Sequence, residues 1–140
     1  MKNTLLALLL LISSFAFSQR NETTYQVQAG IFSQYAQKWN WNEALNEQID
    51  IKLEGSSIYI YNKNNTVITT YEDLGEKRGY DDDNDAYKTH TWLAYDNKNR
   101  KCKFMMTWYE SDDLPIMIYS VIYNDVAFRY YIRRTKLSNF

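Results

Sequence analysis

Acidic residues are densest in one short run of the sequence, which contains Asp81, Asp82, Asp83 and Asp85. Asp81, Asp83 and Asp85 match positions 1, 3 and 5 of a calcium-binding loop. The match then fails, because Ala86 stands where the loop needs glycine and Trp92 stands where a bidentate glutamate belongs. The spacing excludes an EF-hand. The three aspartates remain candidates for a looser metal site, against the simpler interpretation of a solvated acidic loop.

The sequence has a single histidine, His90, and a single cysteine, Cys102. A catalytic histidine needs a nucleophile and an orienting carboxylate, and no serine in a nucleophile-elbow pattern accompanies His90. An unpaired cysteine in an exported protein persists most safely when it is buried, so Cys102 is expected in the core. Glu72, Glu110 and Asp113 could converge as paired carboxylates, but no pattern singles them out. We therefore predict no catalytic residue, no enzymatic activity and no cofactor.

Aromatic side chains are the most distinctive feature, with 4 tryptophans, 13 tyrosines and 6 phenylalanines. Such side chains bury a large area each, and the phenol and indole groups can hydrogen-bond at a wet boundary. Two interpretations follow: the rings fill the interior of the protein, or part of the set lines a ligand cavity. The candidate ligand-binding residues are Trp92, Trp108, Tyr119 and Tyr130.

The elements that must position these side chains show a period-two alternation of apolar and polar residues, which is typical of half-buried strands. The alternation predicts strands over residues 49–54, 57–61, 66–72, 87–95, 101–109, 116–123 and 126–134. Tight turns are expected at Gly55-Ser56 and at Asn124-Asp125. The glycines and aspartates of residues 73–86 break the pattern and predict a loop.

The segment around Gly30 fits two patterns. Tyr25 and Val27 alternate as in a strand, whereas Ile31, Phe32 and the apolar residues after them also follow the spacing of an amphipathic helix. Because a glycine can sit at a β-bulge as well as at a helix start, Gly30 does not decide between them. We favour a bulged strand.

Together these elements predict an all-β fold with seven to eight antiparallel strands in nearest-neighbour order. Such a meander suits a small closed barrel or a strongly curved sheet, because closure removes exposed edges. An export signal followed by a meander with alternating tryptophan and tyrosine resembles the calycin-like (lipocalin-type) small barrels. The Gly-x-Trp sequence of lipocalins is replaced here by Gly30-Ile31-Phe32, so no functional residue is carried over from that family.

The first 18 residues have the pattern of a secretory signal peptide, with Lys2 before an apolar run that is too short to span a membrane. Ala16 and Ser18 are small residues at the positions that a signal peptidase reads, which predicts cleavage after Ser18. Residues 19–140 then form a single domain. Frequent asparagine, lysine and isoleucine are typical of AT-rich bacterial genomes. We expect a secreted or periplasmic bacterial protein with no membrane span.

The net charge of −1 excludes the electrostatic footprint of a nucleic-acid-binding protein. Residues 19–85 nevertheless carry 6 basic and 12 acidic side chains, and residues 86–140 carry 9 basic and 5 acidic ones. We therefore expect a non-enzymatic binding protein, with an unknown small molecule or an extracytoplasmic protein as its partner. The first hypothesis is a small apolar or aromatic ligand in a barrel cavity. The alternative is a protein-interaction module, such as an inhibitor of a secreted hydrolase or a subunit of a surface assembly.

Overall fold

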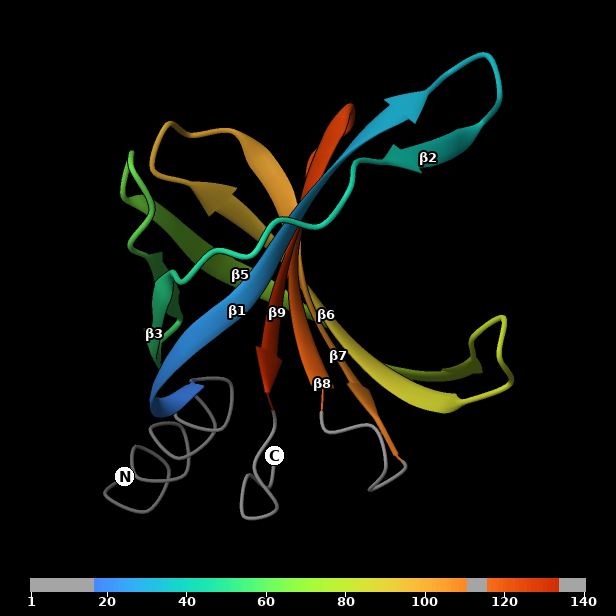
Figure 1. Cartoon of the computed structure of the whole chain (residues 1–140). Coiled ribbons are helices and arrows are strands. Elements are labelled where there is room, and N and C mark those ends of the chain that lie inside the picture. The colour runs from blue at the N-terminus through green and yellow to red at the C-terminus, as the bar shows by residue number, and fades with distance from the viewer. Residues whose placement is uncertain (1–16, 111–115, 134–140) are drawn as a thin grey trace, which may run out of the picture.

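The computed structural model describes residues 17–110 and 116–133, and every regular element in these ranges is a β-strand (Figure 1). The nine strands are β1 (Phe17–Ser33), β2 (Lys38–Trp41), β3 (Asp50–Gly55), β4 (Ser57–Ile60), β5 (Thr66–Tyr80), β6 (Ala86–Asp96), β7 (Lys101–Tyr109), β8 (Ile116–Ile122) and β9 (Val126–Arg133). Of the predicted signal peptide, only Phe17 and Ser18 belong to the described residues.

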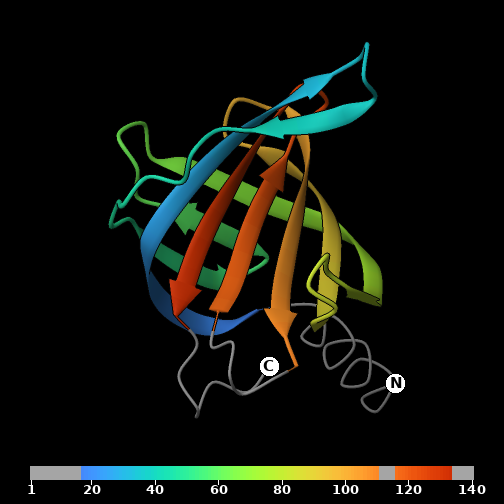
Figure 2. The same ribbon diagram turned by 45° about the vertical axis from the view of Figure 1, so that its right-hand side comes forward.

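Eight of the strands close into an antiparallel barrel, as predicted. Strands β3 to β9 lie beside one another in chain order, and β1 closes the ring by pairing with both β3 and β9 (Figure 2). β1 is long enough for both partners, because residues 17–23 pair with β3 and residues 24–31 pair with β9. The remaining strand, β2, lies outside the ring and forms a projecting hairpin with the end of β1.

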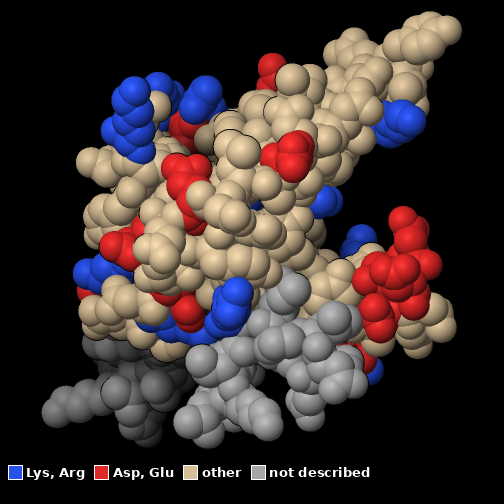
Figure 3. All heavy atoms as spheres, in the orientation of Figure 1, with Lys and Arg blue, Asp and Glu red and all other residues tan. Residues whose placement is uncertain are grey.

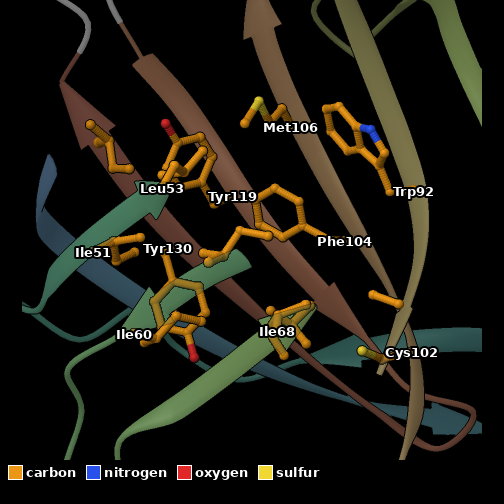
Figure 4. Close-up of a cluster of buried hydrophobic side chains, with 14 of the residues drawn as sticks. Ile51, Leu53, Ile60, Ile68, Trp92, Cys102, Phe104, Met106, Tyr119 and Tyr130 are labelled. Atoms are coloured by element: carbon orange, nitrogen blue, oxygen red, sulfur yellow. The ribbon is translucent and has the colours of Figure 1, made fainter. Parts of the chain in front are cut away.

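The side chains of the inner barrel wall form one apolar cluster (Figure 4). On β7 the inward residues are Cys102, Phe104 and Met106, and on β9 they include Tyr130 and Ile132, in agreement with the predicted alternation. Full burial of a large apolar side chain stabilises a fold by about 1.5–3 kcal/mol relative to exposure. The cluster therefore holds the eight strands together and fills the middle of the barrel.

The segment around Gly30 is a strand, so the favoured interpretation is confirmed and the helical one is wrong. A β-bulge is present, but it lies at Tyr25, where the register of β1 against β9 shifts. Phe32 and Trp39, which would share a helix face, meet instead as a cross-strand pair with ring centroids 5.3 Å apart. Period-two and helical patterns overlap in so short an apolar segment, and pairing with β9 decides between them.

The predicted loop over residues 73–86 is wrong, because β5 continues to Tyr80 and β6 begins at Ala86. The two strands extend beyond the barrel as a hairpin, here named the β5–β6 arm (residues 73–92), whose turn comprises residues 81–85. Two register shifts, one of them between Asp73 and Gly75, interrupt the alternation. Since the β5 half of the arm (residues 73–80) is largely exposed on both faces, its sequence lacks the apolar–polar pattern of a barrel strand.

The two predicted hairpin turns are present. Gly55 has a φ of +63°, the left-handed region that glycine adopts without strain. The β8–β9 turn at Asn124-Asp125 is closed by a 2.8 Å hydrogen bond from the Tyr123 N–H to the Val126 carbonyl oxygen. Positive φ at non-glycine residues occurs elsewhere in the described chain, at Gln37, Asn65, Asn84 and Asn99.

Candidate functional site

A cavity of about 320 Å³ opens at the end of the barrel where the β4–β5 and β6–β7 turns lie. Its wall combines inward side chains of four barrel strands and the segment before β3 with polar side chains of the two turns. The lining comprises Val27, Glu47, Ile49, Asn62, Lys63, Asn64, Thr66, Asn97, Lys98, Arg100, Val121, Tyr123, Phe128 and Tyr130. We name this cavity the mouth cavity.

The two turns that form the rim are tied to each other although they are about 30 residues apart in sequence. The Asn97 side-chain amide donates a 3.1 Å hydrogen bond to the Asn65 carbonyl oxygen, and its Oδ1 accepts a 3.3 Å bond from the Val67 N–H. Within the first turn, Asn62 Oδ1 accepts bonds from the N–H groups of Asn64 and Thr66. Asparagine side chains therefore serve as hydrogen-bond partners for the backbone groups of the two turns that form the rim.

Asp96 anchors the second turn from inside the protein, where it is 4% exposed. Its carboxylate accepts hydrogen bonds of 2.9 Å from the N–H groups of Lys98 and Arg100, and of 2.8 Å from Arg100 Nε and the Tyr123 hydroxyl. Burial alone would raise the pKa of Asp96, but these bonds outweigh burial and lower the pKa to about 2. Asp96 is thus a structural anion beneath the rim.

The floor of the mouth cavity is apolar and aromatic. Val121 and Tyr130 belong to the buried cluster, and Val27 and Phe128 pack against that cluster while facing the cavity. Burial raises the pKa of the Tyr130 phenol to about 12, and a hydrogen bond with Asn62 opposes the rise. The phenol is therefore protonated in neutral solution, and it can donate a hydrogen bond to a ligand above it.

The rim of the mouth cavity is cationic. Lys63, Lys98 and Arg100 line it, and Figure 3 shows lysine and arginine side chains gathered at this end of the molecule. Arg100 is paired with Asp96, whereas Lys63 and Lys98 make no ion pair with any carboxylate of the described residues. Glu47 is the acidic side chain of the lining. The two lysines are available to a ligand anion.

The four predicted ligand-binding residues are not brought together. Tyr130 lines the mouth cavity. Trp92 and Tyr119 both pack against Phe104 in the core, with ring centroids 5.8 Å and 5.7 Å from it (Figure 4). Trp108 packs against the cluster from β7. Aromatic composition alone could not distinguish the aromatic residues that line the cavity from those that fill the core, because the side chains of both groups point into the barrel.

The predicted metal candidates Asp81, Asp83 and Asp85 do converge at the tip of the β5–β6 arm, where one carboxylate oxygen of each lies within 4.8 Å of the others. Figure 3 shows acidic side chains gathered on this arm. Asp81 Oδ1 already accepts hydrogen bonds of 3.0 Å and 2.8 Å from the N–H groups of Asp83 and Asp85. The acidic turn is therefore closed by its own side chain and backbone.

His90 and Cys102 each pack against other side chains of the protein. The His90 ring stacks on Trp92 with centroids 4.0 Å apart, and its Nε2 lies 2.6 Å from Asp73 Oδ1. Burial raises the pKa of the Cys102 thiol to about 11, which leaves it protonated in neutral solution. Glu110 lies near Arg78 and Lys88, and Asp113 is outside the described residues.

Asn62 and Lys63 of the rim and Val27 and Phe128 of the floor line the candidate site, although no sequence pattern singles them out for binding. Lys63 stands in the run Asn62-Lys63-Asn64-Asn65, whose composition indicates a turn and nothing more. Lys98 and Arg100 stand in a basic stretch of the sequence that also contains Lys101 and Lys103. The basic residues of β9 lie apart from the mouth cavity, since Arg129 covers the Trp41 ring at 3.5 Å and Arg133 lies over Tyr25.

A second hollow lies outside the barrel, between the β5–β6 arm and the outer faces of β6 to β9. Its volume is about 720 Å³, and it is here named the outer groove. The lining includes four tyrosines (residues 80, 87, 109 and 131), together with Met105, Ile118 and Arg129. Aromatic and arginine side chains are the types enriched in protein–protein interfaces.

The described residues form a closed eight-stranded antiparallel β-barrel with one further strand in a hairpin. A cavity with an apolar floor and a cationic rim opens at one end of this barrel. No helix of the described residues is long and apolar enough to cross a membrane. Comparison with protein families, with curated proteins and with solved structures finds no match to the chain.

Proposed function

We propose that this protein is a secreted or periplasmic, non-enzymatic binding protein that holds a small anionic amphiphile in the mouth cavity. The ligand has an apolar or aromatic body and one anionic group, as a medium-chain fatty acid or an aromatic carboxylate has. The observation that carries this proposal is the pairing of an apolar floor with the rim lysines Lys63 and Lys98 in a cavity of about 320 Å³. Small-molecule sites begin at about 300 Å³.

The proposed binding site lies at one end of the barrel, because the middle of the barrel is filled by side chains. A ligand in the middle of the barrel would have to displace side chains such as Ile58, Ile68 and Phe104, which are 0% exposed. At the mouth, Phe128 and Tyr130 can contact an apolar body without such displacement. An ammonium group near the cavity entrance attracts a carboxylate, and the partly apolar wall strengthens that attraction relative to water.

Octanoate and octanol test the proposal, because they share an apolar chain and differ in the anionic group. Isothermal titration should show that octanoate binds at least tenfold more tightly than octanol. The double variant Lys63→Gln/Lys98→Gln should lose most of that preference, since it removes both rim charges and leaves the floor intact. Equal affinity for the two ligands, or no binding of either, would refute the proposal.

A matched control removes two lysines elsewhere. Lys38 lies on β2 and Lys77 on the β5–β6 arm, both exposed and away from the mouth cavity. The variant Lys38→Gln/Lys77→Gln changes the net charge by the same amount and should bind octanoate as the wild type does. A floor variant, Val27→Phe, should weaken octanoate and octanol alike because it narrows the cavity.

The outer groove favours a second candidate function, a protein-interaction module. Trp, Tyr and Arg side chains dominate binding energy in protein interfaces, and Arg129 stacks on Trp41 at the margin of this groove. The variant Ile118→Arg changes the groove, and Val27→Phe changes the mouth cavity. A partner that copurifies from the host envelope with wild type and Val27→Phe, but not with Ile118→Arg, would support this function. Loss with both variants would contradict it.

A further inference from the structure

Phe17 occupies an aromatic site at the opposite end of the barrel from the mouth cavity. Its ring lies edge-on to Trp92 with centroids 5.0 Å apart and edge-on to Phe104 with centroids 6.1 Å apart. The side chain is partly buried and packs against the core cluster. Neither Trp92 nor Phe104 lines the mouth cavity. This aromatic site is therefore separate from the proposed anion-binding site.

The predicted cleavage point lies between Phe17 and the regular part of β1. Phe17 pairs with Gly55 and Arg20 pairs with Leu53, so two residues of β1, Ser18 and Gln19, oppose one residue of β3 and form a bulge. Cleavage after Ser18 falls inside this bulge. It removes Phe17 but leaves the pairing from Arg20 onward in place. A chain cleaved at this point would retain the barrel pairing and would lose the ring that contacts Trp92 and Phe104.

The wall of the site is held by contacts that do not involve Phe17. One ring face of Trp92 stacks on His90 with an interplanar angle of 10°, and His90 is tied to Asp73 by the 2.6 Å contact. Phe104 is 0% exposed and packs on Tyr119. Because these neighbours fix both rings, the site keeps its shape better than a site between mobile side chains would.

We propose that removal of the leader vacates a site for one aromatic ring between Trp92 and Phe104, and that the exported protein binds a small uncharged aromatic molecule there. This inference rests on the predicted cleavage after Ser18. It goes beyond the anion-binding function of the mouth cavity. The rings that contact Phe17 are largely apolar, and covering them with an aromatic ligand removes apolar surface from water, as the Phe17 ring itself does. Toluene is the matching probe, because it has the structure of the phenylalanine side chain.

The experiment compares three proteins. The first is the full chain exported with its own leader, with its N-terminus established by intact mass. The second begins with an initiator methionine directly before Phe17, so that it contains every described residue and retains the ring. The third is the second protein with Phe17→Ala. Far-UV circular dichroism establishes that all three are folded, and toluene binding is followed by thermal melting and tryptophan fluorescence.

We expect the exported protein to begin at Gln19 and to bind toluene at least tenfold more tightly than the protein that retains Phe17. The Phe17→Ala protein should bind as the exported one does. At a toluene concentration ten times the Kd, the melting temperature should rise by about 5 °C. Equal toluene binding with and without Phe17, or a folded exported protein that binds none, would overturn the inference, as would an exported chain that still carries Phe17.

The mouth variant Lys63→Gln/Lys98→Gln separates this inference from the proposed function. Exported with the same leader, it should bind toluene as the wild type does, although it loses its preference for octanoate. A parallel loss of toluene binding would show that toluene occupies the mouth cavity, and the assignment to Trp92 and Phe104 would then be wrong.

Discussion

The Tyr123 hydroxyl donates a 2.8 Å hydrogen bond to Asp96 Oδ2, and so joins the end of β8 to the turn between β6 and β7. Tyr123 and Asp96 are 27 residues apart, and both lie beneath the cationic rim. Since the same carboxylate also holds two backbone N–H groups of the turn, a single buried anion sets the position of Lys98 and Arg100.

Asp96 should make the barrel sensitive to acid. Its native pKa of about 2 lies below the ordinary value of 3.8, so the unfolded chain takes up the proton first as the pH falls. The stabilisation is fully present above pH 5 and is lost as the pH falls through the native pKa. A shift of this size corresponds to about 2 kcal/mol. Urea unfolding at pH 5, 4, 3 and 2 measures it.

The matched variant for this prediction is Asp96→Asn, which cannot ionise. At pH 7 it should be less stable than the wild type by about 2–3 kcal/mol, because charged hydrogen bonds to the turn and to Tyr123 are weakened. The difference should shrink as the pH approaches 2. If the wild type and the variant lose stability in parallel between pH 5 and pH 2, the pH dependence has another source.

Cys102 should be unreactive in the folded protein. The thiol is 6% exposed, and burial raises its pKa to about 11, so the nucleophilic thiolate is scarce at pH 8. Iodoacetamide at pH 8 should leave the native protein unmodified over an hour and should alkylate it within minutes in urea, as followed by intact mass. Rapid native labelling would place Cys102 on the outer face of β7.

Gly30 should be intolerant of a side chain. A Cβ at this position would lie 2.7 Å from Cε3 of Trp41, whose ring is itself covered by the Arg129 guanidinium. We expect Gly30→Ala to destabilise the protein by about 1–3 kcal/mol through overpacking. The control is Ile31→Ala on the adjacent, 60% exposed residue, which should change the unfolding free energy by about 0.5 kcal/mol or less. Similar effects of the two substitutions would contradict the close Gly30–Trp41 contact.

Asn99 should be more sensitive than Asn124 to a β-branched residue. Asn99 has a φ of +61°, whereas Asn124 is not among the described residues with positive φ. Valine in the left-handed region costs about 1–2 kcal/mol, so Asn99→Val should lower the unfolding free energy by that amount and Asn124→Val by less. Asn99→Gly should cost little. Chemical denaturation of the three variants gives the order, and the reverse order would contradict the turn geometry.

Calcium should have little effect on stability. Asp81, Asp83 and Asp85 form a turn that is already closed by hydrogen bonds to Asp81, and the loop lacks the bidentate glutamate of tight sites. Melting temperatures in 1 mM calcium and in excess chelator should differ by about 1 °C or less. A rise of several degrees in calcium that Asp83→Asn abolishes would identify a metal site at the tip of the arm.

The sequence alone determined the fold class and the direction in which most barrel side chains point. Alternation is a local property, because successive side chains of a strand point to opposite faces. For this reason the buried position of Cys102 and the tight turn at Gly55 could be predicted. The β5 half of the arm (residues 73–80) could not, since register shifts and exposure on both faces remove the alternation that identifies a strand.

Only the tertiary structure decided how the barrel closes and where the mouth cavity lies. Closure depends on β1, whose residue Gln28 pairs with Arg129 about a hundred positions away, and such pairing follows from strand tilt and register around the whole ring. The cavity likewise joins Lys63 and Lys98 from separate turns to Tyr130 on β9. Each of these residues has an ordinary sequence context, and their convergence is a property of the closed barrel.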